Sequence, residues 1–238
     1  MENIVSHTDT IKYKAIRSTL SSGQHNGAYY YSKEIVKNII PHVKTSRPWD
    51  TLGIRGCGSA DHAIVFLHHN LNWGRVYNWL RNYEDLVLVC SSPKTYEWAK
   101  RQRNAEAIYL PLSIDVEYVE KFRHKKTKGA CYAGNRWKFK EPDLEKYLPE
   151  DVDCFPPDLT RSQLLKKIAP YRECYAVGRT ALEAKVLGCE IKVCDSRYPD
   201  PEFWQILDNK DAAKLLQKEL DAVEKRLERK QWHTAFSR

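Results

Sequence analysis

Ala63-Ile-Val-Phe-Leu67 is an unbroken run of five apolar residues, and Leu86-Val-Leu-Val-Cys90 is a second run of this kind. Strands without polar alternation are typical of parallel sheets, because helices cover both faces of such a sheet. Polar residues follow each run, His68-His69-Asn70 after the first and Ser91-Ser92 after the second. Ligands bind beside the carboxyl ends of parallel strands, so these residues mark one candidate binding edge.

Similar short apolar segments alternate with helical patterns along the rest of the chain. This alternation predicts an α/β protein, and its repetition in the second half predicts two domains. The expected strands are 107–110, 130–133, 174–178 and 190–194, and the expected helices are 28–40, 94–103, 144–148, 161–168, 180–187 and 208–230. The predicted divisions are an N-terminal Rossmann-like domain at 1–120, a second Rossmann-like domain at 121–205, and a C-terminal amphipathic helix at 206–238.

The composition narrows the class of protein. In 238 residues, 42% are hydrophobic and 11% aromatic, which is enough apolar material for a buried core and argues against disorder. No apolar run approaches the roughly 20 residues of a membrane span, and the first residues lack the layout of a secretion signal. Seven cysteines without a Cys-x-x-Cys pair argue against a disulfide framework or a zinc site, and Cys90 and Cys131 are expected to be buried. We therefore expect a cytoplasmic protein without a structural metal.

The formal net charge is +8, and the basic residues are clustered. The segment 121–128 holds six basic residues, and Arg136, Lys138 and Lys140 follow it closely. We expect 121–128 to be a solvated linker between the two halves. The alternative is an electropositive wall that attracts a phosphorylated ligand or an acidic polymer.

The segment Tyr175-Ala-Val-Gly178-Arg-Thr180-Ala-Leu-Glu183-Ala184 carries the strongest signal for a site. A glycine turn at a helix start leaves backbone N–H groups exposed, and with Arg179 nearby this is an anion site suited to a diphosphate. Glu183 is a carboxylate that could accept two hydroxyl hydrogen bonds from a ribose. The alternative is an ordinary capped helix in which Glu183 only complements the helix dipole.

This segment resembles the donor-site signature of glycosyltransferases of the GT-B superfold, in which a Gly-x-x-x-x-Glu-Ala helix meets a sugar nucleotide. Other pieces are similar to that family in the same order along residues 20–195. They are the glycine loop with Gly23 and Gly27, the strand-end histidines His68 and His69, the Pro-x-x-Ile-Asp segment at 111–115, and Gly134-Asn135-Arg136 with Lys138. The resemblance implies two Rossmann-like domains facing each other across a cleft, in a compact version.

The resemblance also implies roles for individual residues. Arg136 and Lys138, with the turn at Gly178, Arg179 and Thr180, would bind the diphosphate of a nucleotide-sugar, and Glu183 would hold its ribose. Gly134 and Asn135 would open the phosphate loop. His69, or His68 beside it, would orient or deprotonate the acceptor hydroxyl. The nucleotide-sugar is then a co-substrate, and no cofactor is expected.

Asp151-Val-Asp153 matches the metal-binding Asp-x-Asp pattern of the other glycosyltransferase superfold. Here it precedes Cys154-Phe-Pro-Pro157 in an apparent loop, so we expect no metal ion there.

The leading hypothesis is a glycosyltransferase that moves a sugar from a nucleotide donor to an acceptor hydroxyl. A sequence pI near 9.0 suggests an acidic acceptor, and a hydroxymethylated DNA base is one such acceptor. The alternative is a non-catalytic nucleic-acid-binding or partner-binding module derived from this fold. It is favoured by the absence of the second glutamate of retaining members, since the nearest acid is Glu173. We expect the C-terminal helix to pack back on the amino domain; the alternative is that it pairs with a second copy of the chain.

Overall fold

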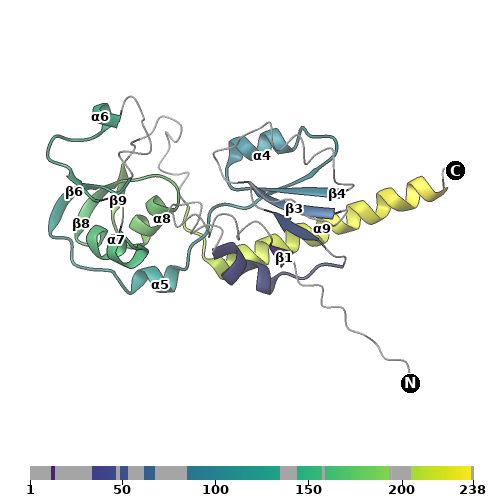
Figure 1. Ribbon diagram of the computed structural model, residues 1–238, viewed down its shortest axis with the longest axis horizontal. Coiled ribbons are helices and arrows are strands. Elements are labelled where there is room, and N and C mark those ends of the chain that lie inside the picture. Colours follow the sequence, from purple (N-terminus) through teal and green to yellow (C-terminus); the bar gives the residue numbers. More distant parts are fainter. Residues whose placement is uncertain are drawn as a thin grey trace, which may run out of the picture. The chain divides into compact units, whose positions relative to one another are not determined.

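A computed structural model describes most of the chain (Figure 1). The described residues are 12–13, 34–46, 49–52, 62–67, 85–134, 144–156, 159–192, 194 and 205–236.

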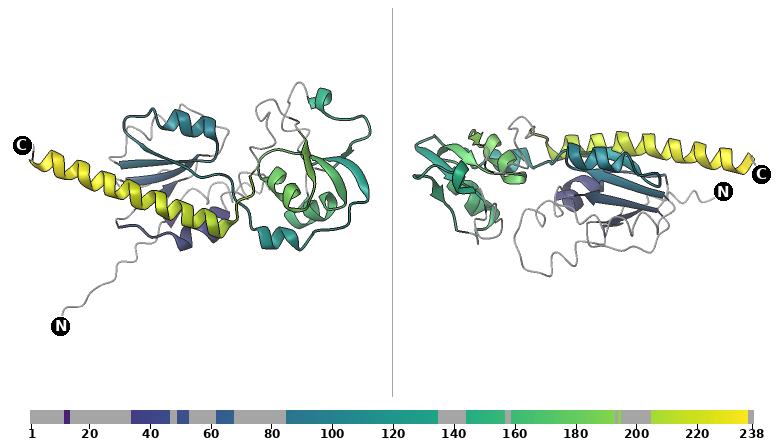
Figure 2. Two further views of the ribbon diagram at one scale, coloured as in Figure 1. Left: turned by 180° about the vertical axis from the view of Figure 1, so that it is seen from behind. Right: turned by 90° about the horizontal axis from the view of Figure 1, so that it is seen from above.

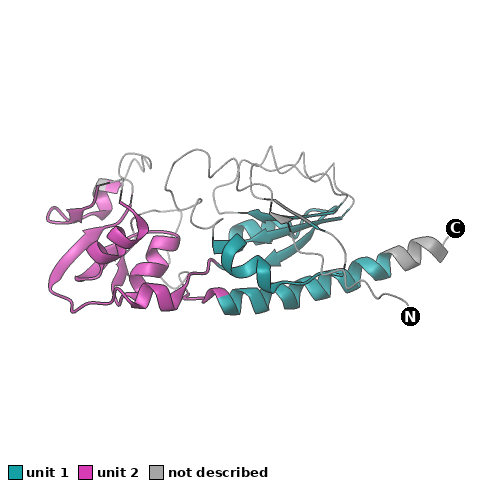
Figure 3. Ribbon diagram, turned by 60° about the horizontal axis from the view of Figure 1, so that its bottom comes forward, with its two compact units in different colours: residues 1–24, 28–111, 210–238 teal, residues 25–27, 112–209 magenta. Residues whose placement is uncertain are grey.

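The chain forms two compact units, which Figure 3 distinguishes by colour. Unit 1 comprises residues 1–24, 28–111 and 210–238, and unit 2 comprises residues 25–27 and 112–209. The chain therefore enters unit 2 after Pro111 and returns to unit 1 after Asn209. The predicted bounds differ from these: the first domain was expected to end at residue 120 and a separate C-terminal helix to begin at 206, whereas the units divide after Pro111 and after Asn209.

The described strands of unit 1 form one parallel sheet in the order β1-β2-β3-β4-β5. Their bounds are β1 Lys12–Tyr13, β2 Asp50–Leu52, β3 His62–Leu67, β4 Asp85–Cys90 and β5 Glu106–Tyr109. In β3 and β4, every residue after the first is buried, so both faces of these strands are covered. The two apolar runs are thus confirmed as strands of a parallel α/β sheet.

Helix α4, Pro93–Ala99, follows β4 and packs against β4 and β5. The side chain of Ser92 accepts a hydrogen bond from the amide of Thr95, and Pro93 occupies the first helical position, where no N–H is needed. The helix ends at Ala99, earlier than the predicted residue 103, and continues only as turns.

The helix predicted at 28–40 is described only at its end. There the chain forms a π-helix, η1 at Ile35–Ile39, and then a 3-10 turn, η2 at Ile40–His42. Pro41 lacks the N–H that a regular helix would use, and helical structure ends at His42, two residues beyond the predicted end. The glycine stretch 53–58 lies outside the described residues.

Helix α9, Asn209–Phe236, is long and amphipathic, as predicted. Its apolar stripe is buried in unit 1, to which the helix belongs from residue 210 onward. The carboxylate of Glu224 accepts hydrogen bonds from the Ser46 amide and from Trp49 Nε1, and Arg226 and Lys230 pair with Glu106. The stripe consists of Ala212, Ala213, Leu216, Leu220, Val223 and Leu227.

The described strands of unit 2 form a second parallel sheet in the order β7-β6-β8-β9. Their bounds are β6 Lys128–Tyr132, β7 Asp153–Cys154, β8 Tyr171–Tyr175 and β9 Glu190–Lys192. The helices are α5 Val116–Glu120, α6 Leu144–Tyr147, α7 Arg161–Ile168 and α8 Arg179–Val186. Helices α7 and α8 contact each other and lie side by side (Figure 2).

The strand order of unit 2 contains a reversal. The chain moves from β6 to β7 in one direction along the sheet and then crosses back past β6 to β8. Because parallel crossovers are right-handed, such a reversal sends the helices before and after it to opposite faces of the sheet. In parallel α/β sheets, ligands bind at the carboxyl ends of the strands on either side of such a reversal, which here are β6 and β8. Both units are therefore parallel α/β structures, as the sequence predicted.

Within the described part of the chain, no helix combines the length and apolar character that crossing a bilayer requires.

Candidate functional site at the carboxyl edge of unit 2

Two glycine turns meet at the reversal point of the unit 2 sheet. The amide of Ala133, just after β6, donates to the carbonyl of Tyr175 at the end of β8, at 3.0 Å. This bond places Gly134 beside the turn that leads into α8. A Cβ atom at position 134 would overlap the Tyr132 hydroxyl, so glycine keeps this turn narrow.

Gly178 turns the chain from β8 into α8. Its φ of 64° and ψ of −140° lie in a region that is open to glycine and costly for other residues. No side-chain hydrogen bond caps this helix start, and the first intrahelical bonds run to the Gly178 carbonyl from Ala181 and Leu182. The first-turn amides thus point toward the carboxyl edge of the sheet, where an anion is favoured.

Glu183 joins the starts of the two neighbouring helices. Its Oε1 atom accepts hydrogen bonds from Nε of Arg179 at 2.8 Å and from Nε of Arg161 at 2.9 Å. Arg179 and Arg161 are the first residues of α8 and α7, and Glu183 is only 3% exposed. The residues Arg161, Arg179 and Glu183 are called the arginine–glutamate cluster below.

A third helix supports this cluster. The guanidinium of Arg161 lies over the ring of Tyr118 in α5, 4.8 Å from the ring centroid. Tyr118 in turn makes an edge contact with Phe122 at 5.3 Å between ring centroids. A partly desolvated cation over an aromatic ring gains about 0.5–2 kcal/mol, so Tyr118 helps to fix the orientation of Arg161.

The placement of both arginines opposes the helix dipoles. Neither α7 nor α8 has an acidic residue in its first turn, and each begins with arginine. A cation at the positive end of a helix is unfavourable by a few tenths of a kcal/mol to about 1 kcal/mol. Departures from local rules of this kind are expected where a site serves a ligand rather than stability.

The structure places the predicted site residues as follows. Gly134, Gly178, Arg179 and Glu183 lie at or just behind the carboxyl edge of the unit 2 sheet, and Thr180 is half-buried in the first turn of α8. The remaining predicted residues lie outside the described part of the chain; they are Gly23, Gly27, His68, His69, Asn135, Arg136 and Lys138.

Neither Arg161 nor Tyr118 was predicted as a site residue. Thr160 caps the start of α7 with a full capping box to Gln163. The available signal was that Arg161 directly follows this cap, just as Arg179 directly follows Gly178. Two arginines at the starts of consecutive helices would have suggested a shared anion site.

The basic segment 121–128 is largely exposed to solvent, as expected, but it is not a linker, because it lies within unit 2. Arg123 donates to the Val186 carbonyl at the end of α8, and Lys126 donates to the Ala169 carbonyl after α7. Cations at helix carboxyl ends satisfy carbonyl groups that have no intrahelical partner. Lys128 is the first residue of β6, and its Nζ lies 3.1 Å from the Tyr171 hydroxyl.

Asp151-Val-Asp153 was expected to lie in a loop, but Asp153 begins strand β7. Its carboxylate accepts a hydrogen bond from the Tyr171 hydroxyl, and Lys128 lies 3.9 Å away. Burial, followed by the bond to Asp153, raises the pKa of Tyr171. Among the described residues, no group of three or more His, Cys, Asp or Glu side chains is arranged to hold a metal ion.

The buried thiols of unit 2 are unsuited to nucleophilic chemistry. Cys131 and Cys174 are direct register partners on β6 and β8. A hydrogen bond with Cys131, together with burial, raises the pKa of the Cys174 thiol well above its usual value. In unit 1, burial raises the pKa of Cys90 to about 12. Because the thiolate is the reactive form, these cysteines act as small core residues, as predicted for Cys90 and Cys131.

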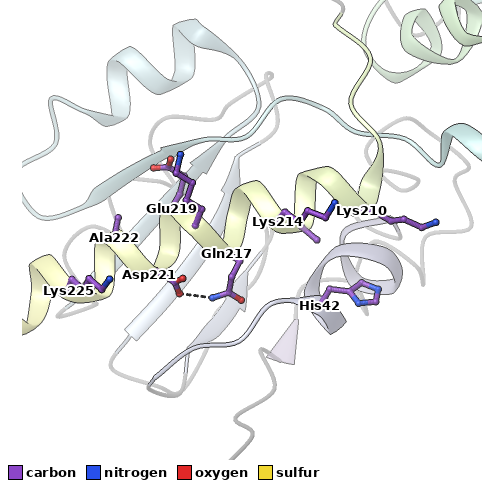
Figure 4. Close-up of a pocket in the computed structure, with 10 residues that line it drawn as sticks. His42, Lys210, Lys214, Gln217, Glu219, Asp221, Ala222 and Lys225 are labelled. Atoms are coloured by element: carbon purple, nitrogen blue, oxygen red, sulfur yellow. Dashed lines mark hydrogen bonds between the residues drawn. The ribbon is translucent and has the colours of Figure 1, made fainter.

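Unit 1 carries a surface pocket of about 870 Å³ along α9 and His42 (Figure 4). Gln217 spans part of it, bonding to the backbone of Lys44 and to the carboxylate of Asp221. Its other polar lining side chains are lysines and Glu219 of α9. Apart from His42, the lining residues come from a single helix, so this pocket lacks the converging groups of a catalytic site.

Comparisons with protein-family models, with curated proteins and with solved structures gave no match to this chain.

Proposed function

We propose that the protein is a glycosyltransferase that moves a sugar from a nucleotide-sugar to an acceptor hydroxyl. The donor's diphosphate is bound at the carboxyl edge of unit 2. The observation that carries this proposal is the arginine–glutamate cluster, which holds two guanidinium groups at two adjacent helix starts beside the strand reversal.

A diphosphate leaving group gains negative charge as the sugar is transferred, and groups that stabilise this charge contribute most to the rate. Arg161, Arg179 and the first-turn amides of α8 supply such groups. Arg136 and Lys138, just beyond Gly134 in the chain, are proposed to join them.

Unit 1 is proposed to bind the acceptor. Strand β3 ends at Leu67, so His68 and His69 follow directly from the carboxyl edge of the unit 1 sheet. One of the two histidines is proposed to accept the proton of the acceptor hydroxyl as the sugar's bond to the diphosphate breaks.

The proposal is tested first by thermal shift of the full chain with UDP-, GDP-, ADP- and CMP-sugars. A donor present at 100 times its Kd stabilises the folded protein by about 2.7 kcal/mol, so the matching donor raises the melting temperature. Calorimetry with that donor then compares Arg161→Ala with Arg172→Ala, which removes an exposed cation from β8. We expect affinity to fall at least tenfold, about 1.4 kcal/mol, for R161A only.

Transfer of labelled sugar to hydroxymethylated DNA, lipid and peptide acceptors identifies the acceptor class. If no nucleotide-sugar binds, and affinity for DNA is steeply salt-dependent, the glycosyltransferase proposal fails in favour of a nucleic-acid-binding module.

A further inference from the structure

Glu183 makes contacts that do not suit a ribose ligand. Its Oε1 atom already receives two charge-assisted hydrogen bonds, and its side chain is 4% exposed. A carboxylate that holds the two hydroxyl groups of a ribose needs an accessible face. In this structure, Oε1 of Glu183 is turned toward Arg161 of α7 and Arg179 of α8.

We propose that Glu183 is a positioning residue, which holds Arg161 and Arg179 in place for the diphosphate of the donor rather than binding its ribose. This inference rests on the proposed function, because it assigns the ligand of the same site. The ligand class is a pyrophosphate group, whether it is free or part of a nucleoside diphosphate.

The physical reason is the repulsion between like charges. Two guanidinium groups that share one oxygen lie within a few ångströms of each other, and each belongs to the first residue of a helix. Like charges this close repel each other much more strongly in a partly buried site than in water. Without Glu183, we expect the two side chains to separate, and the site then loses its prearranged geometry.

Arg161 is the more accessible arginine of the cluster. Glu183 engages Nε of each arginine, which orients both guanidinium groups. The Arg161 side chain is 15% exposed and the Arg179 side chain is 6% exposed, so Arg161 is the better placed of the two to meet a phosphate. Arginine contacts phosphates through paired N–H groups.

The experiment measures two affinities of the full chain by calorimetry. The ligands are inorganic pyrophosphate and the free nucleoside of the donor found in the thermal-shift screen. The variants are Glu183→Gln, which keeps the size and removes the charge, and Glu190→Gln, which changes an exposed glutamate of the same unit. We expect E183Q to weaken pyrophosphate binding at least tenfold and to leave nucleoside binding within twofold, and E190Q to change neither.

A ribose ligand would give the opposite pattern, with nucleoside affinity lost and pyrophosphate affinity kept, and this result overturns the inference. Equal losses of both affinities also overturn it, as does a wild-type chain that does not bind pyrophosphate. If the wild-type chain binds pyrophosphate but no nucleotide-sugar, the proposed function fails, while the role of Glu183 is still decided by E183Q.

Arg161→Lys covers the case in which E183Q does not fold. The Arg161 side chain is 15% exposed. Lysine at this position keeps the charge, but it lacks the several N–H donors with which a guanidinium contacts both Glu183 and a phosphate. We expect R161K to weaken pyrophosphate about tenfold and to leave nucleoside affinity unchanged. Wild-type affinity for pyrophosphate in R161K overturns the inference.

Discussion

At Gly178, the backbone conformation itself determines where the candidate site forms. The turn from β8 into α8 requires a positive φ, and the residue that follows is Arg179 of the arginine–glutamate cluster. A residue with a Cβ atom would be strained at this position. Relaxing that strain would rotate the start of α8. Gly178 therefore contributes to both the stability of unit 2 and the geometry of the site.

We expect Gly178→Ala to lower the free energy of unfolding of unit 2 by about 1–3 kcal/mol, the usual cost of a strained backbone position. Urea unfolding followed by circular dichroism measures this change. The matched control is Gly129→Ala in β6, where an added Cβ meets nothing within 4 Å and φ is not positive. Equal stability of the two variants would show that Gly178 does not need glycine.

At the scale of elements, α9 is attached to unit 1 by more than its apolar stripe. Glu224 is a buried carboxylate, 7% exposed, that accepts hydrogen bonds from the Ser46 amide at 3.0 Å and from Trp49 Nε1 at 2.9 Å. These bonds connect the helix to the segment just before β2. Removing the acceptor would take this bond from the buried Trp49 N–H, and losing a partner for a buried donor costs more than the bond itself contributes.

We expect Glu224→Gln to destabilise unit 1 by about 1–3 kcal/mol, because an amide replaces a charged acceptor of the buried Trp49 N–H and of the Ser46 amide. Thermal unfolding compares it with Glu228→Gln, an exposed position one turn further along α9. A loss of the same size in E228Q would mean that helix charge, rather than the bonds to Ser46 and Trp49, produces the effect.

At the scale of the whole molecule, unit 1 is assembled from segments on both sides of unit 2 in the sequence. Residues 210–238 return to unit 1 after unit 2 is complete, and Leu220 of α9 is fully buried there. The stability of unit 1 therefore depends on the last part of the chain, whereas the candidate site in unit 2 does not include it.

We expect Leu220→Ala to destabilise unit 1 by about 2–5 kcal/mol, the usual cost of truncating a buried leucine. Hydrogen–deuterium exchange read by mass spectrometry should show faster exchange in peptides from β3 and β4, with peptides from β6 and β8 unchanged. Lys218→Ala, an exposed change two residues away, serves as control. Faster exchange in both units would show that they unfold together.

The apolar runs at 63–67 and 86–90, the Thr160 cap and the amphipathic stripe of α9 could all be predicted from the sequence, because each depends on neighbours along the chain. Gly188, which follows α8 with a φ of 84°, is likewise a local signal for the end of a helix. Short strands were harder to predict. Only two residues of β7 pair with β6, and the polar Arg172 and Glu173 concealed the first half of β8.

The sequence by itself determined the class of each unit and the candidate turn at Gly178, since periodicity, glycines and caps are local properties. Only the tertiary structure decided that Arg161 meets Glu183, which lies 22 residues later, and that the basic segment 121–128 supports helix ends. The physical reason is that the strand crossing from β7 to β8 sets α7 beside α8. That crossing depends on packing between strands, and no pattern within a single segment encodes it.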